Sequence, residues 1–111
     1  MAPNNVSAFD LQTTSIGLSW DFENKVRDVL GILTGFIIFY QMANSSSAPV
    51  LQHEVQDGNA RQGYITELDV YRFYKISIAG KTRVGHGMIS EEIYVRTLGT
   101  GLYRSPFTFL E

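Results

Sequence analysis

Apolar and polar residues alternate over seven short segments of this chain, and each segment is followed by residues that favour turns. In SIGLSW, residues 15–20, Ile16, Leu18 and Trp20 share one face, because successive side chains of a strand point to opposite faces. Helical periodicity is weak, although one or two helical turns remain an alternative over residues 22–31. The pattern predicts an all-β fold, a seven-stranded antiparallel sandwich of two sheets. The predicted strands span residues 6–11, 15–20, 35–42, 49–55, 63–68, 72–80 and 91–97.

The most apolar stretch, VLGILTGFIIFYQM at residues 29–42, contains no charged side chain. A helix that crosses a bilayer needs about 20 consecutive apolar residues. This stretch is shorter, glycine and threonine interrupt it, and polar residues follow it. We therefore expect a buried strand here and no insertion into a membrane. We expect no signal peptide either, because MAPNNVSAFD has neither a basic nor an apolar region.

Composition excludes several classes of function. The 111 residues include 9 Lys and Arg against 11 Asp and Glu, which gives a net charge of −2. Because no basic stripe concentrates the cations, we expect no nucleic-acid partner. The absence of cysteine excludes a disulfide scaffold, a thiolate metal site and a cysteine nucleophile. At 44% apolar and 18% charged residues, the chain is typical of a globular domain.

Residues able to catalyse a reaction or to hold a metal do not form a recognisable motif. His53 and His86 have no companion at ligand spacing and are predicted to be surface loop residues. Glu91 and Glu92 are neighbours in a predicted strand and therefore point to opposite faces. The serines of residues 45–47 lack the glycines of a nucleophile elbow. We expect no enzyme activity, no metal and no cofactor.

Several residues stand in an order that is specific to one family. TTSIGLSW ends in a tryptophan, GILTGFIIFY carries an alternating strand, and ITELDVYRFYKISIAGKTRVGHGMIS places a leucine six residues before a tyrosine. These residues are Trp20, Gly35, Leu68, Tyr74, Gly85 and Thr97. Over about residues 3–98 the chain resembles a fibronectin type III domain. The chain departs from the family at Phe22 and Val70, near which the family usually has proline.

The resemblance implies a domain over residues 1–98 and a C-terminal linker or tail over residues 99–111. It also implies a non-catalytic interaction module, for adhesion or receptor recognition, in a larger cell-surface or extracellular protein. Its partners would be another protein or neighbouring domains of the same chain, and weak self-association is left open. Two alternatives remain, a structural spacer without a ligand and an accessory domain attached to an enzyme such as a receptor phosphatase or a secreted glycosidase.

The same resemblance assigns structural roles to three residues, Trp20, Leu68 and Tyr74. Trp20 is expected in the core, and Leu68 and Tyr74 resemble the leucine and tyrosine of the family's tyrosine corner. In that arrangement the Tyr74 hydroxyl is expected to donate a hydrogen bond to backbone just upstream. A buried phenol needs such a partner, because an unpaired buried polar group costs about 1–3 kcal/mol.

A candidate interface follows from the strand order of the family, in which the third strand lies beside the sixth and seventh. Alternation then turns Phe36, Ile38 and Tyr40 to the core and the residues between them outward. The candidate interface residues are Ile37, Phe39, Phe73 and Tyr94, rimmed by Lys75, Glu92 and Arg96. An apolar and aromatic face with a charged rim suits a protein contact. The alternative is that the C-terminal tail or residues 49–53 cover this face.

Two sequons are candidate N-glycosylation sites. They are Asn5-Val6-Ser7 and Asn44-Ser45-Ser46, and the second falls in a predicted exposed loop, where a glycan is tolerated. The pattern also arises by chance. Together the sequons modestly favour an extracellular or cell-surface setting.

Overall fold

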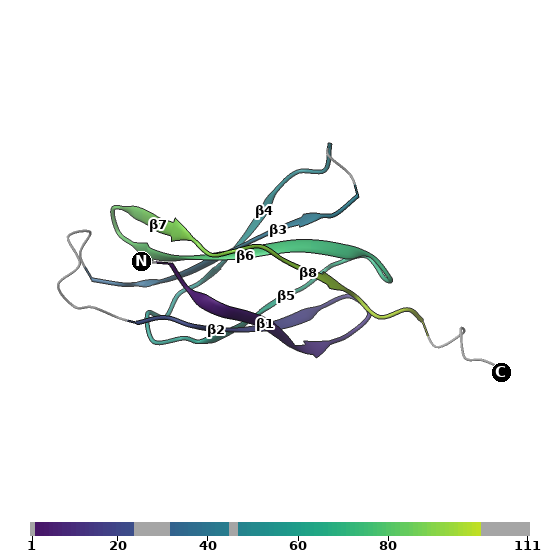
Figure 1. Ribbon diagram of the computed structural model, residues 1–111, viewed down its shortest axis with the longest axis horizontal. Helices are drawn as coiled ribbons and strands as arrows, with labels where there is room; N and C mark the ends of the chain where they lie inside the picture. Colours follow the sequence, from purple (N-terminus) through teal and green to yellow (C-terminus); the bar gives the residue numbers. More distant parts are fainter. Residues whose placement is uncertain (1, 24–31, 45–46, 101–111) are drawn as a thin grey trace.

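The computed structural model describes residues 2–23, 32–44 and 47–100. Two antiparallel sheets pack face to face, as the two layers in Figure 1 show. One sheet has the strand order β1-β2-β5, and the other has the order β4-β3-β6, with both β7 and β8 paired with β6. The predicted all-β sandwich is therefore confirmed. The strands are β1 (Asn4–Leu11), β2 (Ile16–Asp21), β3 (Gly35–Met42), β4 (Leu51–Val55), β5 (Gln62–Ile65), β6 (Phe73–Thr82), β7 (Gly85–Ile89) and β8 (Ile93–Arg96).

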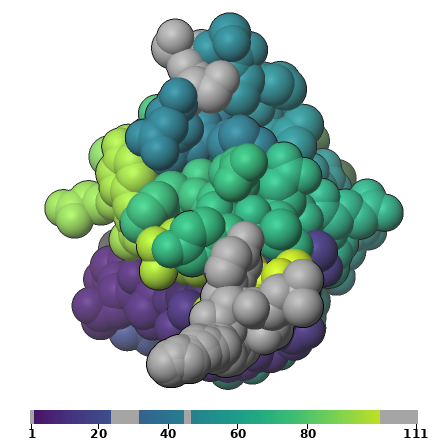
Figure 2. Space-filling view, turned by 90° about the vertical axis from the view of Figure 1, so that its right-hand side faces the viewer, coloured from purple at the N-terminus to yellow at the C-terminus, as the bar shows by residue number. Residues whose placement is uncertain are grey.

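The core lies between the sheets and is built from the alternating apolar residues of both. Seen from one end, the chain of β3 and β4 projects at the top, β6 lies in the middle and the N-terminal strands lie below (Figure 2). The Trp20 and Phe36 rings, one from each sheet, lie 5.2 Å apart between centroids, a separation that suits tilted aromatic packing. Among the described residues, the large apolar side chains that are fully buried are Ile16, Leu18, Phe36, Ile38, Ile65, Ile76 and Ile78, and Trp20 is 2% exposed.

The described residues form eight strands where the sequence predicts seven, because β7 (Gly85–Ile89) lies between the predicted strands of residues 72–80 and 91–97. The pairing of β6 moves from Ala79 opposite Ile89 to Ile76 opposite Ile93, so β7 and β8 follow one another along the same edge of β6. Between them the backbone N–H of Ile78 donates to the Ser90 hydroxyl at 2.9 Å, and the Ser90 N–H donates to the Ile78 carbonyl at 2.8 Å. A serine side chain thus replaces a backbone partner, as at a β-bulge.

A tyrosine corner is present, but its hydrogen bond runs in the direction opposite to the prediction. The backbone N–H of Asp69 donates to the Tyr74 hydroxyl oxygen at 2.8 Å, so the phenol accepts from the backbone. Tyr74 and Leu68 are each 5% exposed. Thr97, which is fully buried, completes the corner: its hydroxyl donates to the Asp69 carbonyl at 2.7 Å and accepts from the Arg72 N–H at 3.0 Å.

The most apolar stretch of the sequence contributes a central strand, β3, which pairs with β4 on one side and β6 on the other. None of the described residues forms a helix long and apolar enough to cross a bilayer. The helical turns considered for residues 22–31 fall mainly on residues 24–31, outside the described part of the chain, as do residues 101–111 of the predicted tail. Both stay predictions.

Candidate protein-contact site

The register of β6 brings two of the candidate interface residues together. Phe73 lies opposite Arg96 and Lys75 lies opposite Tyr94 across the β6–β8 pair. Directly opposed side chains in an antiparallel pair have Cβ atoms roughly 4.5–5.5 Å apart. On the other side of β6, Gln41 of β3 lies opposite Lys75. Two aromatic and two cationic side chains therefore share one end of the outer face of this sheet.

A third aromatic residue, Tyr71, joins this group from the loop before β6. The Arg96 guanidinium carbon lies 4.4 Å from the centroid of the Tyr71 ring and 5.4 Å from that of Phe73, within the range of cation–π attraction. The three rings are nevertheless open to solvent, at 49% for Tyr71, 43% for Phe73 and 60% for Tyr94. We call Tyr71, Phe73, Lys75, Tyr94 and Arg96 the aromatic surface.

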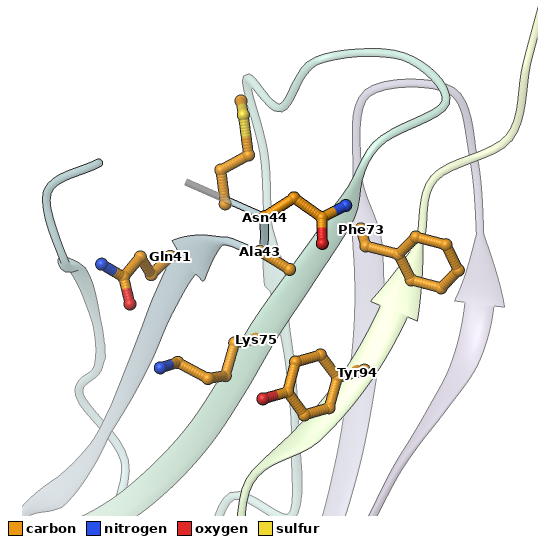
Figure 3. Close-up of a pocket in the computed structure, with 7 residues that line it drawn as sticks. Gln41, Ala43, Asn44, Phe73, Lys75 and Tyr94 are labelled. Atoms are coloured by element: carbon orange, nitrogen blue, oxygen red, sulfur yellow. The ribbon is translucent and has the colours of Figure 1, made fainter. Parts of the chain in front are cut away.

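The aromatic surface contains two adjoining hollows that meet at Phe73. The larger, of about 650 Å³, is bounded by the Phe73 and Tyr94 rings on one side and by Lys75 and Gln41 on the other, with Asn44 at its rim (Figure 3). The second, of about 470 Å³, lies between Asn44, Phe73 and the stacked pair Tyr71 and Arg96. Lys75 lines the larger hollow and Arg72 and Arg96 line the second, and no acidic side chain of the described residues lines either. The hollows therefore carry more positive than negative charge, although the Lys75 ammonium lies 3.8 Å from the Glu92 carboxylate.

The other two candidate interface residues are covered, so the prediction that they form an open face is wrong for Ile37 and only partly right for Phe39. Ile37 is 6% exposed. It lies opposite Glu54 on one side and Ala79 on the other, and the Glu54 carboxylate meets the Lys81 ammonium at 2.8 Å. This ion pair joins β4 and β6, the strands on either side of β3, close to Ile37. Because Ala79 is small, the neighbouring side chains can close over Ile37.

Phe39 is half-buried because a ring from another strand packs on it. The His86 ring of β7 meets the Phe39 ring edge to face, with centroids 5.4 Å apart. Both histidines predicted for surface loops lie on strands, His53 in β4 and His86 in β7, and both are exposed. Within the described part of the chain no three histidine, aspartate or glutamate side chains are placed to hold a metal ion.

Sequence reasoning missed a second aromatic pair, which lies on the outer face of the other sheet. Phe9 and Tyr64, 46% and 41% exposed, meet edge to face with centroids 5.7 Å apart. They approach over Gly17, where an added Cβ would lie 2.9 Å from the Tyr64 ring. The Tyr64 hydroxyl donates to the Asp10 carboxylate at 2.7 Å, and this bond raises the pKa of Tyr64. Val6 and Ala8 pack against the core, so alternation along β1 places Phe9 on the outer face, and a register shift in β1 lies between Ala8 and Asp10.

The two candidate glycosylation sites lie in different settings. Asn44 is exposed in the turn that follows β3, and its φ of 61° is in the left-handed region, which asparagine tolerates better than most residues. Asn5 is exposed within β1, and its amide nitrogen donates to the Asp21 carboxylate at 2.8 Å. Ser45 and Ser46 of the second sequon lie outside the described residues.

Residues 1–96 match the family described as "Fibronectin type III domain", and the chain belongs to this family. Among curated proteins it is 30% identical over 96 residues to a "Protein sidekick homolog" of Caenorhabditis briggsae, covering 86% of this chain and 4% of that protein. It is 33% identical over 97 residues to "Cell adhesion molecule DSCAM" of Homo sapiens, covering 86% and 5% respectively. The chain therefore spans about a twentieth of the length of these relatives.

Solved structures agree with this membership. The FN5 domain of Drosophila Lar superposes with a TM-score of 0.70 at 28% identity, covering 89% of this chain and 97% of that one. The third fibronectin III domain of human KIAA0343 protein gives a TM-score of 0.80 over 95% of this chain and 87% of that one, and at 22% identity it supports the fold alone. The chain is a fibronectin type III module similar to modules of cell adhesion molecules.

Proposed function

We propose that this domain is a protein-interaction module of a larger cell-surface or extracellular protein, and that its contact site is the aromatic surface. One observation carries the proposal: three exposed rings and a stacked arginine lie together at one end of a sheet, while on the same face Ile37 is buried and Phe39 is half-buried. Exposed aromatic and arginine side chains are enriched in the energetically important centres of protein interfaces.

The charge of the aromatic surface favours an acidic partner. Lys75 and Arg96 lie in its centre, and Glu92 at its edge is within 3.8 Å of Lys75. Arg96 is already held between two rings, so less side-chain freedom is lost when it pairs with a carboxylate. The partner would be another protein or a neighbouring domain of the same chain.

A structural spacer is the second candidate, and an accessory domain of an enzyme is the third. The centre of the outer face, where Ile37 is buried and Phe39 half-buried, favours the spacer, because a spacer needs no open apolar surface. The exposed rings of Phe73 and Tyr94 favour a contact site instead. A direct measurement of binding distinguishes the spacer from the contact site.

Replacing Phe73 and Tyr94 together by serine is expected to abolish most of the binding. Each ring removed from the centre of a contact is expected to cost about 1–2 kcal/mol of binding free energy, or roughly tenfold each. The measurement uses beads coated with the 111-residue chain, scored for capture by cells and for bead-to-bead aggregation. If the double variant no longer captures cells, the partner is a different molecule on the cell surface. If it no longer aggregates, the partner is a second copy of this chain.

The matched control is Phe9→Ser, which removes an exposed ring of similar size from the opposite sheet. Its binding is expected to equal that of the unchanged chain. Thermal unfolding of each variant is measured in parallel, because surface substitutions are expected to change stability by no more than about 0.5 kcal/mol. Beads that neither aggregate nor capture cells would support the spacer. Binding that is unchanged when Phe73 and Tyr94 are replaced would overturn the aromatic surface as the contact site.

A further inference from the structure

The second sequon and the aromatic surface meet in space, although they were recognised from unrelated features of the sequence. Asn44 lines both hollows together with Phe73. The backbone N–H of Ala43 donates to the Phe73 carbonyl at 2.9 Å, which fastens the turn containing Asn44 to the beginning of β6. Figure 3 shows the Asn44 amide above the hollow, extending on the side of the Phe73 ring.

The chemistry of the hollow suits the first sugar of an N-linked glycan. That sugar, N-acetylglucosamine, is attached to the asparagine amide nitrogen, so it would extend from Asn44 toward Phe73. One face of its pyranose ring presents C–H groups with partial positive charge, and the face of an aromatic ring is negative. The Lys75 ammonium has three donors and lies 3.8 Å from Glu92, longer than a direct hydrogen bond. It can therefore also donate to the N-acetyl carbonyl.

We propose that the hollow beside Phe73 is the seat of the first sugar of an N-linked glycan on Asn44, and that this glycan controls the aromatic surface by covering it. The glycosylated chain has its rings packed against sugar, and the unmodified chain presents them to a protein partner. The inference rests on the proposed function for its setting, because N-glycans are added only to chains that enter the secretory route. It adds a modification that regulates the proposed contact site.

The test uses the 111-residue chain secreted from animal cells behind a cleavable signal peptide, with Ser7→Ala to remove the first sequon. Mass spectrometry measures occupancy of Asn44, and an endoglycosidase then trims the glycan to its first sugar. The reference without sugar carries Ser46→Ala, which removes the sequon and keeps the asparagine. Both forms are compared with Phe73 intact and with Phe73→Ser.

With Phe73 intact, the single sugar is expected to raise the midpoint of thermal unfolding by about 2–6 °C, the shift expected from one aromatic contact. With Phe73→Ser this rise should disappear. The N-acetyl methyl protons, shifted upfield by the ring, should return to their free position. The proposed sugar site would be overturned if Asn44 carried no glycan. It would also be overturned if the rise in the unfolding midpoint and the methyl chemical shift were the same with Phe73 and with Phe73→Ser.

Asn5 provides the matched control. In a chain with Ser46→Ala and an intact first sequon, the sugar sits on β1, beside hollows whose one aromatic lining residue among the described residues, Trp20, is 2% exposed. Any change that this sugar causes should not depend on Phe73.

Binding separates the inference from the proposed function. Loss of bead binding on glycosylation of Asn44 supports control by the glycan, and unchanged binding overturns it. If the unmodified chain binds nothing while the sugar still depends on Phe73, the proposed contact site fails and the sugar seat stands.

Discussion

Trp20→Ala is expected to reduce the free energy of unfolding by about 3–5 kcal/mol, because it removes the largest ring from a closed core. Trp20 is 2% exposed and packs on Phe36 of the opposite sheet at 5.2 Å. A loss of this size is a large share of the roughly 5–15 kcal/mol that holds a typical domain together. Denaturant unfolding followed by circular dichroism measures it, since the substitution removes the sole tryptophan as a fluorescent probe.

Trp20→Phe is the matched control and should cost much less, about 1–2 kcal/mol, because a ring of related shape remains. The indole N–H makes no hydrogen bond with any of the described residues, so its removal there breaks no bond. An alanine variant within about 1 kcal/mol of the unchanged chain would contradict the account, because deletion of a buried ring costs more than that.

Thr97→Val is expected to cost about 2–3 kcal/mol although the side chain keeps its shape. The Thr97 hydroxyl donates to the Asp69 carbonyl at 2.7 Å and accepts from the Arg72 N–H at 3.0 Å. Valine leaves both backbone groups without this partner, and a lost hydrogen bond costs about 1 kcal/mol, or more where the remaining group is buried. Chemical denaturation of both chains gives the difference.

Thr97→Ser separates the hydroxyl from the methyl group. Serine keeps both hydrogen bonds and loses one methyl, so it should be more stable than the valine variant by at least about 1 kcal/mol. A serine variant less stable than the valine variant would mean that Thr97 acts by packing and not by joining the loop before β6 to the chain that leaves β8.

The sandwich and its core were predictable because they depend on local patterns. The alternation around Trp20 was sufficient to indicate a strand, and the resemblance of Leu68 and Tyr74 to the family's leucine and tyrosine implied a corner between the sheets. The direction of the Tyr74 hydrogen bond was not predictable, because a hydroxyl group can both donate and accept. The strand β7 at Gly85–Ile89 was missed, and the Ser90 bonds to Ile78 that lie between β7 and β8 are contacts that only the register defines.

The candidate site was predicted in part, for a related reason. Alternation shows which face a side chain occupies but not what covers it. Ile37 is covered because Glu54 and Lys81, distant in sequence, meet across β3. Tyr71 was missed because it lies in a loop, where no alternation applies. The proximity of Asn44 to Phe73 depends on a backbone hydrogen bond from Ala43, in the turn after β3, to Phe73 of β6. In each case the missing information was a contact between segments distant in sequence.

The central claim is that the aromatic surface touches the partner, and photo-crosslinking tests it most directly. A photoreactive phenylalanine analogue replaces Tyr94 in one version of the unglycosylated chain and Phe9 in another, and each is irradiated on the cells or beads that it binds. The account predicts covalent adducts from position 94, with those from position 9 at the level of an unirradiated sample. Adducts from position 9 alone, or from neither position while binding persists, would contradict it.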